Sequence, residues 1–395
     1  MQLYVRTLEP RDARPLEIVE RKGRGHPDTL CDAIAEDVSV HYARYTREHF
    51  GRVLHHNVDK VLLCAGASRP ALGGGEVIAP IEIVLAGRAT AELEGARIPV
   101  HELAIEAARA RLGRDVPELD LERHVRIESR IRPGSGELRA LFARGAAEPL
   151  ANDTSIGVGY APLGELERVV LAVEPALTSD AARAAHPALG PDVKVMGART
   201  ERGIELTIGC AMIGRHLRSL DDYRASVERV RRIAIERARE ITGRSVEVLV
   251  NAADDLARGE LYLTVTGTSA EAGDDGEVGR GNRASGLITP GRPMTLEAAA
   301  GKNPVSHVGK LYGVLAMRIA DAIVRELDGV ASAECTLVSR IGRPVRDPWL
   351  VELALAAAAS ERSAVRVAAQ RIVVRELGAL DALRDAILEQ RVQLY

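Results

Sequence analysis

Apolar residues recur every three or four positions in five stretches of the chain, a pattern that predicts amphipathic helices. The predicted helices span residues 28–49, 100–112, 220–242, 304–327 and 379–391. Between them, short segments rich in β-branched residues mostly alternate apolar and polar positions, which is typical of strands. The clearest predicted strands span residues 81–87, 204–213, 246–252, 261–267 and 334–342.

The order of these segments favours one class of fold. Strands and helices do not alternate with the regular spacing of βαβ units, so we expect an α+β protein with mixed or antiparallel sheets rather than a doubly wound parallel sheet. No repeat of fixed period is visible in the sequence, although structural repeats with diverged sequences would escape such an inspection.

Composition narrows the class of protein. A chain of 395 residues, 46% apolar and 28% charged, can bury a large core and divide into two or three structural units. The net charge of −3 gives no basic excess, so we expect no nucleic acid and no membrane as a partner. No segment approaches the ~20 apolar residues of a membrane span, and the N-terminal stretch lacks the apolar core of a signal peptide.

Cysteine and lysine usage add two points. The spacing of the four cysteines excludes a CxxC pair or a zinc knot, so we expect reduced thiols in a cytoplasmic protein. Of the 53 basic residues only five are lysines. Lysine carries a compact charge and arginine a planar fork, so a retained lysine suggests a place where a fork would not fit, with chance retention as the alternative. The five lysines are Lys22, Lys60, Lys194, Lys302 and Lys310.

The segment ERKGRGHPDTLCD, residues 20–32, combines glycines, a proline and charges at a predicted helix start. Gly23 and Gly25 permit close backbone approach, and the free N–H groups of a helix start bind anions. Asp28 and Asp32 lie four apart on one helix face and could hold a divalent cation. A capped helix with solvated charges is the alternative. Three side chains add positive charge at the same point: Lys22, Arg24 and His26.

Three further loops carry small or charged residues that suit a ligand. LANDTSIGVGYAPL, residues 150–163, suggests a nucleotide-contacting loop but lacks the full G-x-G-x-x-G pattern, and a plain turn into a strand is the alternative. RPGSGE, residues 132–137, offers small residues with spare backbone donors. TGTSAEAGDDGEVGRGNR, residues 266–283, is glycine-rich, and a solvated hairpin is its alternative. Its charged side chains include Asp274, Asp275, Arg280 and Arg283.

The segment AAAGKNPVSHVGKLYGV, residues 298–314, imitates a phosphate-binding P-loop without being one. Leu296 and Asn303 stand where a Walker motif requires glycine and Ser or Thr, which disfavours a P-loop ATPase or kinase. Lys194 stands alone in PDVKVMG, residues 191–197, where a solvated lysine on a strand edge is the alternative.

Together the loops offer separated cations and a few carboxylates suited to Mg²⁺, without a convincing nucleophile–base pair. Such a set suits the departure of a polyphosphate, which needs mainly positioning and stabilisation of charge on the leaving oxygens.

Six motifs, in register from about residue 16 to 345, resemble those of the archaeal-type methionine adenosyltransferases, whereas the final fifty residues carry no signature. The motifs are GRGHPDTLCD, HHNVDKV, LANDTSIGVGYAPL, PDVKVMG, GDDGEVGRGNR and SGLITP with GKNPVSHVGK. The resemblance implies three similar α+β units around a pseudo-threefold axis, which we place at residues 1–140, 141–265 and 266–395 with segments exchanged between units. It also implies a homodimer with active sites at the subunit interface.

The activity implied by the resemblance is the synthesis of S-adenosylmethionine from ATP and L-methionine. The methionine sulfur attacks C5′ of ATP, and the released tripolyphosphate is hydrolysed to diphosphate and phosphate. Mg²⁺ would be the cofactor, with two ions per site, and a K⁺ requirement is left open.

The resemblance also carries over residue roles. His26 would steady the leaving oxygen, Lys194 would reach the polyphosphate near the reacting carbon, and Arg280 with Lys302 would clamp the phosphates. Asp153 would meet the ribose and methionine end. The further ATP or substrate contacts would be Lys22, Gly134, Ser135, Gly136, Asp274, Arg283, His307 and Lys310.

Asp28 would bind Mg²⁺, with Asp275 as the second ligand. The common bacterial branch has a lysine at the position of Thr29 and an aspartate after its GKDP-type segment, where this chain reads NPVSHVGK. RPGSGE departs from the GQGSMD-like loop expected of archaeal relatives. Two alternative functions stay open: a same-fold adenosyltransferase that prefers a methionine analogue, and an ATP-binding regulatory subunit without turnover. The complete charged set favours catalysis.

Overall fold

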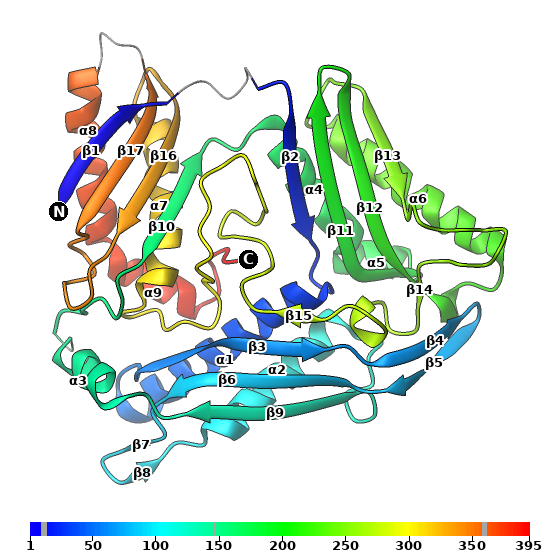
Figure 1. Ribbon diagram of the computed structural model, residues 1–395, viewed down its shortest axis with the longest axis horizontal. Coiled ribbons are helices and arrows are strands. Elements are labelled where there is room, and N and C mark those ends of the chain that lie inside the picture. The colour runs from blue at the N-terminus through cyan, green and yellow to red at the C-terminus, as the bar shows by residue number, and fades with distance from the viewer. Residues whose placement is uncertain (9–13, 146, 358–361) are drawn as a thin grey trace.

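Three β-sheets form the frame of the molecule and surround a common centre (Figure 1). The computed structural model describes residues 1–8, 14–145, 147–357 and 362–395. We name each sheet after its first strand in the sequence. The β1 sheet contains, in order, β1 (Gln2–Thr7), β17 (Leu350–Ala357), β16 (Val330–Val338) and β10 (Ile156–Ala161).

The other two sheets each take a strand or loop from outside their main run of sequence. The β2 sheet contains β13 (Val246–Val250), β12 (Gly203–Ile213), β11 (Leu189–Thr200) and β2 (Glu17–Lys22), with the short β14 (Leu263–Thr264) beside β12. The β3 sheet contains β15 (Gly276–Glu277), β3 (His56–Cys64), β6 (Ile81–Ala89) and β9 (Val125–Arg132). Two short ribbons pair β4 (Ala67–Ala71) with β5 (Gly74–Ala79) and β7 (Glu92–Leu93) with β8 (Ala96–Arg97).

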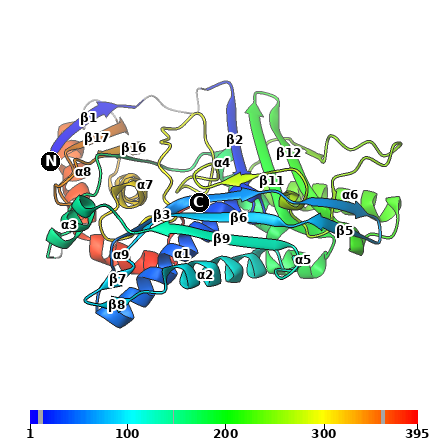
Figure 2. The same ribbon diagram turned by 60° about the horizontal axis from the view of Figure 1, so that its bottom comes forward.

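Helices cover one face of each sheet, as the turned view of the β3 sheet makes clear (Figure 2). On the β3 sheet lie α1 (Pro27–Phe50) and α2 (Val100–Asp115). On the β2 sheet lie α4 (Glu165–Thr178) and α6 (Leu220–Arg239), with α5 (Asp180–Ala185) following α4. On the β1 sheet lie α7 (Val308–Glu326), α8 (Arg362–Gly378) and α9 (Leu380–Leu388). The remaining helix, α3 (Gly136–Arg144), follows β9.

Each sheet and its helices enclose a separate apolar core. Parallel pairs join β1 to β17, β12 to β13 and β6 to β9, and the neighbouring pairs in the sheets are mostly antiparallel. The expected α+β fold of mixed sheets is therefore confirmed. The strands of one sheet come from distant parts of the chain, and the division of the sequence at residues 140 and 265 stays a prediction.

All five predicted helices are confirmed as α1, α2, α6, α7 and α9. Helix α7 begins at Val308 rather than at 304 because the Asn303 side chain accepts the N–H groups of Val305 and Ser306, which holds a turn there. The pattern missed α3, α4, α5 and α8.

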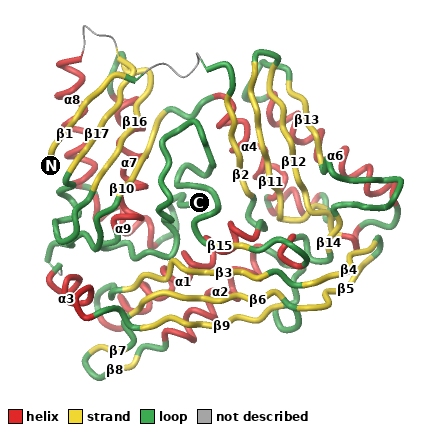
Figure 3. Tube along the Cα trace, in the orientation of Figure 1, coloured by secondary structure: helices red, strands yellow, loops and turns green. Residues whose placement is uncertain are grey.

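The predicted strand 261–267 is wrong, because only Leu263–Thr264 pairs in a sheet. The Glu271 carboxylate accepts the N–H groups of Val265 and Thr266 at 2.7 and 2.6 Å and so occupies donors that a ladder would need. The strand predicted at 334–342 begins earlier and ends earlier, at Val330–Val338. Most of the chain between β14 and α7 is loop and runs through the centre of the molecule (Figure 3).

Strand β10 packs against α7 at a distance that only glycine allows. A Cβ atom at Gly157 would lie 2.2 Å from the Tyr312 carbonyl carbon, and one at Gly159 would lie 2.1 Å from the Met317 nitrogen. The two glycines therefore bring β10 into direct backbone contact with α7.

We expect Gly159→Ala to destabilise the fold by roughly 1–3 kcal/mol or more, because the added methyl group collides with backbone that cannot move alone. Urea unfolding would measure the loss. Gly313→Ala is the matched control, since no atom lies within 4 Å of a Cβ there and an alanine in a helix is favoured over glycine by about 1 kcal/mol. Equal midpoints for the two variants would contradict the close-approach argument.

Candidate active site

The turn between β2 and α1 is held against β11 by two glycine N–H groups. Gly23 donates to the Val193 carbonyl at 2.6 Å, and Gly25 donates to the Pro191 carbonyl at 3.0 Å. A Cβ atom at Gly25 would lie 2.6 Å from the Asp192 nitrogen, so the approach excludes a side chain. The turn delivers His26 as the N-cap of α1, with a proline at the first helical position.

His26 is buried and neutral at this helix start. Its Nδ1 accepts the N–H of Asp28 at 3.2 Å, and its Nε2 lies 3.8 Å from an oxygen of Asp274. The pKa of His26 is lowered to about 4, and burial is the largest cause. The positive charge of Lys22 also lowers this pKa, by more than the Asp28 charge raises it. Because Nδ1 accepts, the neutral ring carries its proton on Nε2, which is free to donate.

Two of the five lysines face each other across neighbouring strands. Lys22 on β2 is the register partner of Lys194 on β11. Like charges placed opposite each other destabilise a sheet unless a group of opposite charge lies near both. The Glu20 carboxylate is the shared neighbour, at 3.5 Å from Lys194 and 4.0 Å from Lys22. The Lys194 side chain remains 46% exposed, so its ammonium is accessible from solvent.

Asp28 completes the charged surroundings of His26. It accepts from Lys22 at 2.8 Å and from the N–H of Glu277 at 3.0 Å. Burial alone would raise the pKa of Asp28, but the Lys22 hydrogen bond and the Glu277 N–H outweigh it, so the pKa is lowered. The pKa of Asp274 is raised instead, first by burial and then by the Asp28 charge.

The GDDGEVGRGNR loop brings some of its predicted residues to this point and turns others away. The Arg280 carbonyl accepts from Lys22 at 3.0 Å, and the Arg280 side chain is exposed. Asp275 turns away and accepts the N–H of Ala65 at 2.8 Å. Arg283 turns inward and donates to the carbonyls of its own loop. We call the residues that come together here the HPD group: Lys22, His26, Asp28, Lys194, Asp274 and Arg280.

A second group of charges surrounds the start of α7. Lys302 contacts Glu297 at 2.5 Å and lies 3.7 Å from Asp59. His307 is the N-cap of α7 and is buried, and its Nδ1 has no hydrogen-bond partner in the described part of the chain. Burial lowers the pKa of His307 well below its usual range, and the charges of Lys302 and Lys310 lower it further. Lys310 contacts both oxygens of Glu36.

Asp153 and the RPGSGE loop lie at the same end of the molecule as this second group. Asn152 donates its N–H to the Ser306 carbonyl and accepts from Val308, which fixes the exposed Asp153 beside the start of α7. The glycine–serine–glycine stretch leads into α3, and a Cβ atom at Gly134 would lie 2.8 Å from the His55 ring. We call the second set the GKNP group: Asp153, Lys302, His307, Lys310, Asp59, Glu297 and Glu36.

The two groups lie at different ends of β3. Gly276, next to the HPD group, pairs with Leu63, whereas Lys302 pairs with Asn57. Six residues of strand correspond to about 20 Å between these two backbone positions.

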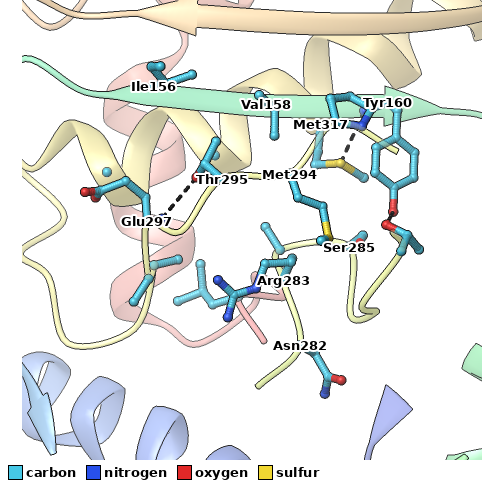
Figure 4. Close-up of a pocket in the computed structure, with 18 of the residues that line it drawn as sticks. Ile156, Val158, Tyr160, Asn282, Arg283, Ser285, Met294, Thr295, Glu297 and Met317 are labelled. Carbon is cyan, nitrogen blue, oxygen red and sulfur yellow. Dashed lines mark hydrogen bonds between the residues drawn. The ribbon is translucent and has the colours of Figure 1, made fainter. Parts of the chain in front are cut away.

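Two cavities adjoin these groups. A small one of about 50 Å³ lies between β10, α7 and the loop before α7, and Val158, Arg283 and Met294 are among the residues that line it (Figure 4). Asp32 also lines it, and burial raises the pKa of Asp32 to about 7. A larger cavity of about 550 Å³ lies beside α3 and is lined in part by His55 and Arg139.

The carboxylates suited to a cation are few. Among the described residues no three His, Cys, Asp or Glu side chains gather as a metal site. Mg²⁺ is usually held by one or two carboxylates together with substrate phosphates, so Asp28 and Asp274 are compatible with such an ion.

Sequence reasoning missed four carboxylates that contact the predicted lysines: Glu20, Glu36, Asp59 and Glu297. Glu20 and Asp59 lie in motifs that had been singled out, ERKGRGHPDTLCD and HHNVDKV, but neither had been given a role. Glu36 and Asp59 are distant in sequence from the lysines they contact, Lys310 and Lys302, so these pairs leave no pattern in the chain.

The sequence model of one family, described as S-adenosylmethionine synthetase (AdoMet synthetase), matches residues 2–391. A probable S-adenosylmethionine synthase of Aquifex aeolicus is 53% identical over 350 residues, 88% of each chain. An S-adenosylmethionine synthase of Methanothrix thermoacetophila is 46% identical over 98% of each chain. In structure, the chain is similar to an unusual S-adenosylmethionine synthetase from Campylobacter jejuni, with a TM-score of 0.59 at 16% identity over 86% of this chain and 81% of that one. At that identity the likeness concerns the fold alone.

Among the described helices, none has the length and apolarity needed to cross a membrane.

We expect Lys22→Met to raise the pKa of His26 above about 4, because a nearby positive charge is removed. NMR titration of the ring protons would measure the shift. In the wild type the unfolded chain binds the His26 proton at higher pH than the folded chain, so stability is lost as the pH falls from about 6.5 toward 4. The variant should lose less in that window. Arg24→Met is the control, since Arg24 pairs with Asp180, and an equal shift there would contradict the assignment to Lys22.

Proposed function

The chain belongs to the S-adenosylmethionine synthetase family, and we propose that its HPD and GKNP groups together hold the triphosphate of ATP during adenosyl transfer to methionine. The reaction converts ATP, L-methionine and water to S-adenosylmethionine, phosphate and diphosphate. The observation that carries the residue assignment is the cross-strand pair of Lys22 and Lys194 beside His26. Two facing cations beside the N-terminus of a helix, which itself favours anions, suit a ligand with several negative charges.

The chemical step breaks the bond between C5′ and the triphosphate oxygen. The methionine sulfur supplies the electron pair for the new carbon–sulfur bond, and the pair of the broken bond remains on the leaving oxygen. His26 suits this oxygen because its neutral ring presents Nε2–H as a donor. Lys194 would support the same charge, since its exposed ammonium lies as far as 3.5 Å from the Glu20 carboxylate and can turn to a ligand.

The remaining cations bind the rest of the triphosphate. Arg280 is exposed next to Lys22, and Lys302 would exchange Glu297 for a phosphate oxygen. Asp153 would contact the ribose and methionine end. Contacts of the RPGSGE loop and of Arg283 with ATP rest on the family resemblance.

A divalent cation would be held by Asp28, with Asp274 as the better-placed second carboxylate, because Asp275 bonds to the backbone of Ala65. When bound, Mg²⁺ neutralises charge on the phosphate oxygens. Two ions per site and a K⁺ ion follow from the family resemblance alone.

We further propose a homodimer in the cytoplasm with active sites at the subunit interface. The two groups lie beside different ends of β3, and a second copy would bring one group of each kind to the same triphosphate. The face of each sheet opposite its helices exposes large apolar side chains, which favours a covering partner. These side chains are Tyr4, Ile18, Leu62, Ile156 and Leu249. The four cysteines are free, in keeping with a reducing compartment.

Purified protein given ATP, Mg²⁺ and methionine should form S-adenosylmethionine, diphosphate and phosphate in equal amounts, measured by mass spectrometry and phosphate assay. Parallel reactions with methionine analogues test the preference for the side chain, because a pocket discriminates one methylene by only ~1–3 kcal/mol. Stoichiometric ATP binding without any product would contradict catalysis.

Lys194→Arg and Lys302→Arg should each lower kcat by an order of magnitude or more, because the planar fork misplaces the charge at sites fitted to a lysine. Steady-state kinetics with both substrates would measure the loss. Arg325→Lys, at an exposed ion pair on α7, is the control and should retain wild-type kcat. Wild-type turnover in both lysine variants would refute these roles.

A further inference from the structure

We propose that the buried pair of Glu36 and Lys310 positions the GKNP backbone, so that Lys310 acts through Glu36 and Gly301 rather than by touching phosphate. The inference rests on the proposed function of Lys302 as a phosphate ligand. It assigns Glu36 of α1 as a positioning residue for the reaction.

The pair is closed to solvent. The Lys310 ammonium lies 2.8 and 2.7 Å from the two oxygens of Glu36. The Lys310 side chain is 0% exposed and that of Glu36 is 5% exposed. If Lys310 moved to a phosphate, it would leave a buried carboxylate without its charge partner, which is strongly unfavourable.

Glu36 also bonds to the backbone next to Lys302. Its Oε2 accepts the N–H of Gly301 at 3.0 Å, and the Gly301 carbonyl accepts from Val58 at 2.9 Å. Gly301 has φ +79, and a Cβ atom there would lie 2.7 Å from the Val58 carbonyl oxygen. Glu36 and β3 thus hold Gly301 by its N–H and its carbonyl, in a backbone conformation that glycine adopts readily and other residues do not.

The same helix holds the other side of Lys302. The Ser39 hydroxyl donates to the Lys302 carbonyl at 3.1 Å and contacts His56 at 2.8 Å. Glu36 and Ser39 lie one turn apart on α1 and bind the peptide groups before Gly301 and after Lys302, which hold this two-residue segment at both ends. The Lys302 side chain is left to contact Asp59 and Glu297.

Lys310 is needed so that Glu36 can accept as a carboxylate in this interior. Burial raises the pKa of Glu36, and the Lys310 charge and hydrogen bonds oppose that rise. Burial lowers the pKa of Lys310, and the Glu36 charge opposes that change in turn. The two charges stabilise each other, so Lys310 allows Glu36 to serve as a buried acceptor for the Gly301 N–H.

Two double variants separate positioning from direct contact. Both replace Lys310 by methionine, so neither leaves a buried charge unpaired. Glu36→Gln/Lys310→Met keeps a side-chain acceptor for the Gly301 N–H, whereas Glu36→Met/Lys310→Met removes it. The readouts are KM and kcat for tripolyphosphate hydrolysis, with the thermal midpoint of each variant. S-adenosylmethionine formation by the wild type tests the proposed function separately.

Positioning predicts that Glu36→Met/Lys310→Met raises KM for tripolyphosphate tenfold or more, while Glu36→Gln/Lys310→Met stays within about threefold of the wild type. An equal loss in both double variants would mean that Lys310 itself binds phosphate and would overturn the proposal. A wild-type KM in both would overturn it as well.

Two single variants distinguish a loss of positioning from a general loss of stability. Ser39→Ala removes the second backbone contact in a small change and should raise KM severalfold, which keeps the idea testable if a double variant fails to fold. Tyr223→Phe removes the hydrogen bond of a buried tyrosine to Asp254, at 2.6 Å, from α6 in the core of the β2 sheet. It should lower the thermal midpoint without changing KM for tripolyphosphate, and a matching rise in KM would reduce the Glu36 effect to general destabilisation.

Discussion

The pairing of β2 with β11 sets Lys22 against Lys194, and much of the candidate site depends on this unfavourable meeting of like charges. Glu20 partly compensates it, Lys22 contacts Asp28 and the Arg280 carbonyl, and burial together with the Lys22 charge keeps His26 neutral. Like charges directly opposite each other destabilise a sheet. The proposed triphosphate would offset this repulsion, which ties the proposed site to the register of the sheet.

Sequence analysis predicted the elements whose apolar periodicity is clear. It failed where contacts with residues distant in the sequence determine the local structure. Helix α4 was missed because Glu167 and Glu174 interrupt its apolar face, and both are buried there by pairing with Arg292 and Arg21 from other parts of the chain. The strand at 261–267 failed for a related reason, since Glu271 captures backbone donors that β-branched residues would give to a ladder. In both cases a tertiary contact of one carboxylate outweighed local preference.

The same limit applies to the candidate site. Motif positions identified His26, Asp28, Lys194 and Lys302, because helix starts and lone lysines leave a local signature. They did not reveal that Lys310 lies fully buried against Glu36. Nor did they separate Asp274, which faces His26, from Asp275, which faces β3. Adjacent carboxylates differ only in the direction their side chains take, and that direction is set by the sheet against which the loop packs.

The parallel pairing of β1 with β17 has a consequence for the order of assembly. Residues 2–7 lie beside residues 350–355, so the β1 sheet receives its edge strand from the opposite end of the described chain. During synthesis β1 leaves the ribosome early and stays unpaired until β17 has also emerged. At 5–20 residues per second this interval is roughly 20–70 s. During this interval the unpaired edge of β1 can pair with other nascent chains.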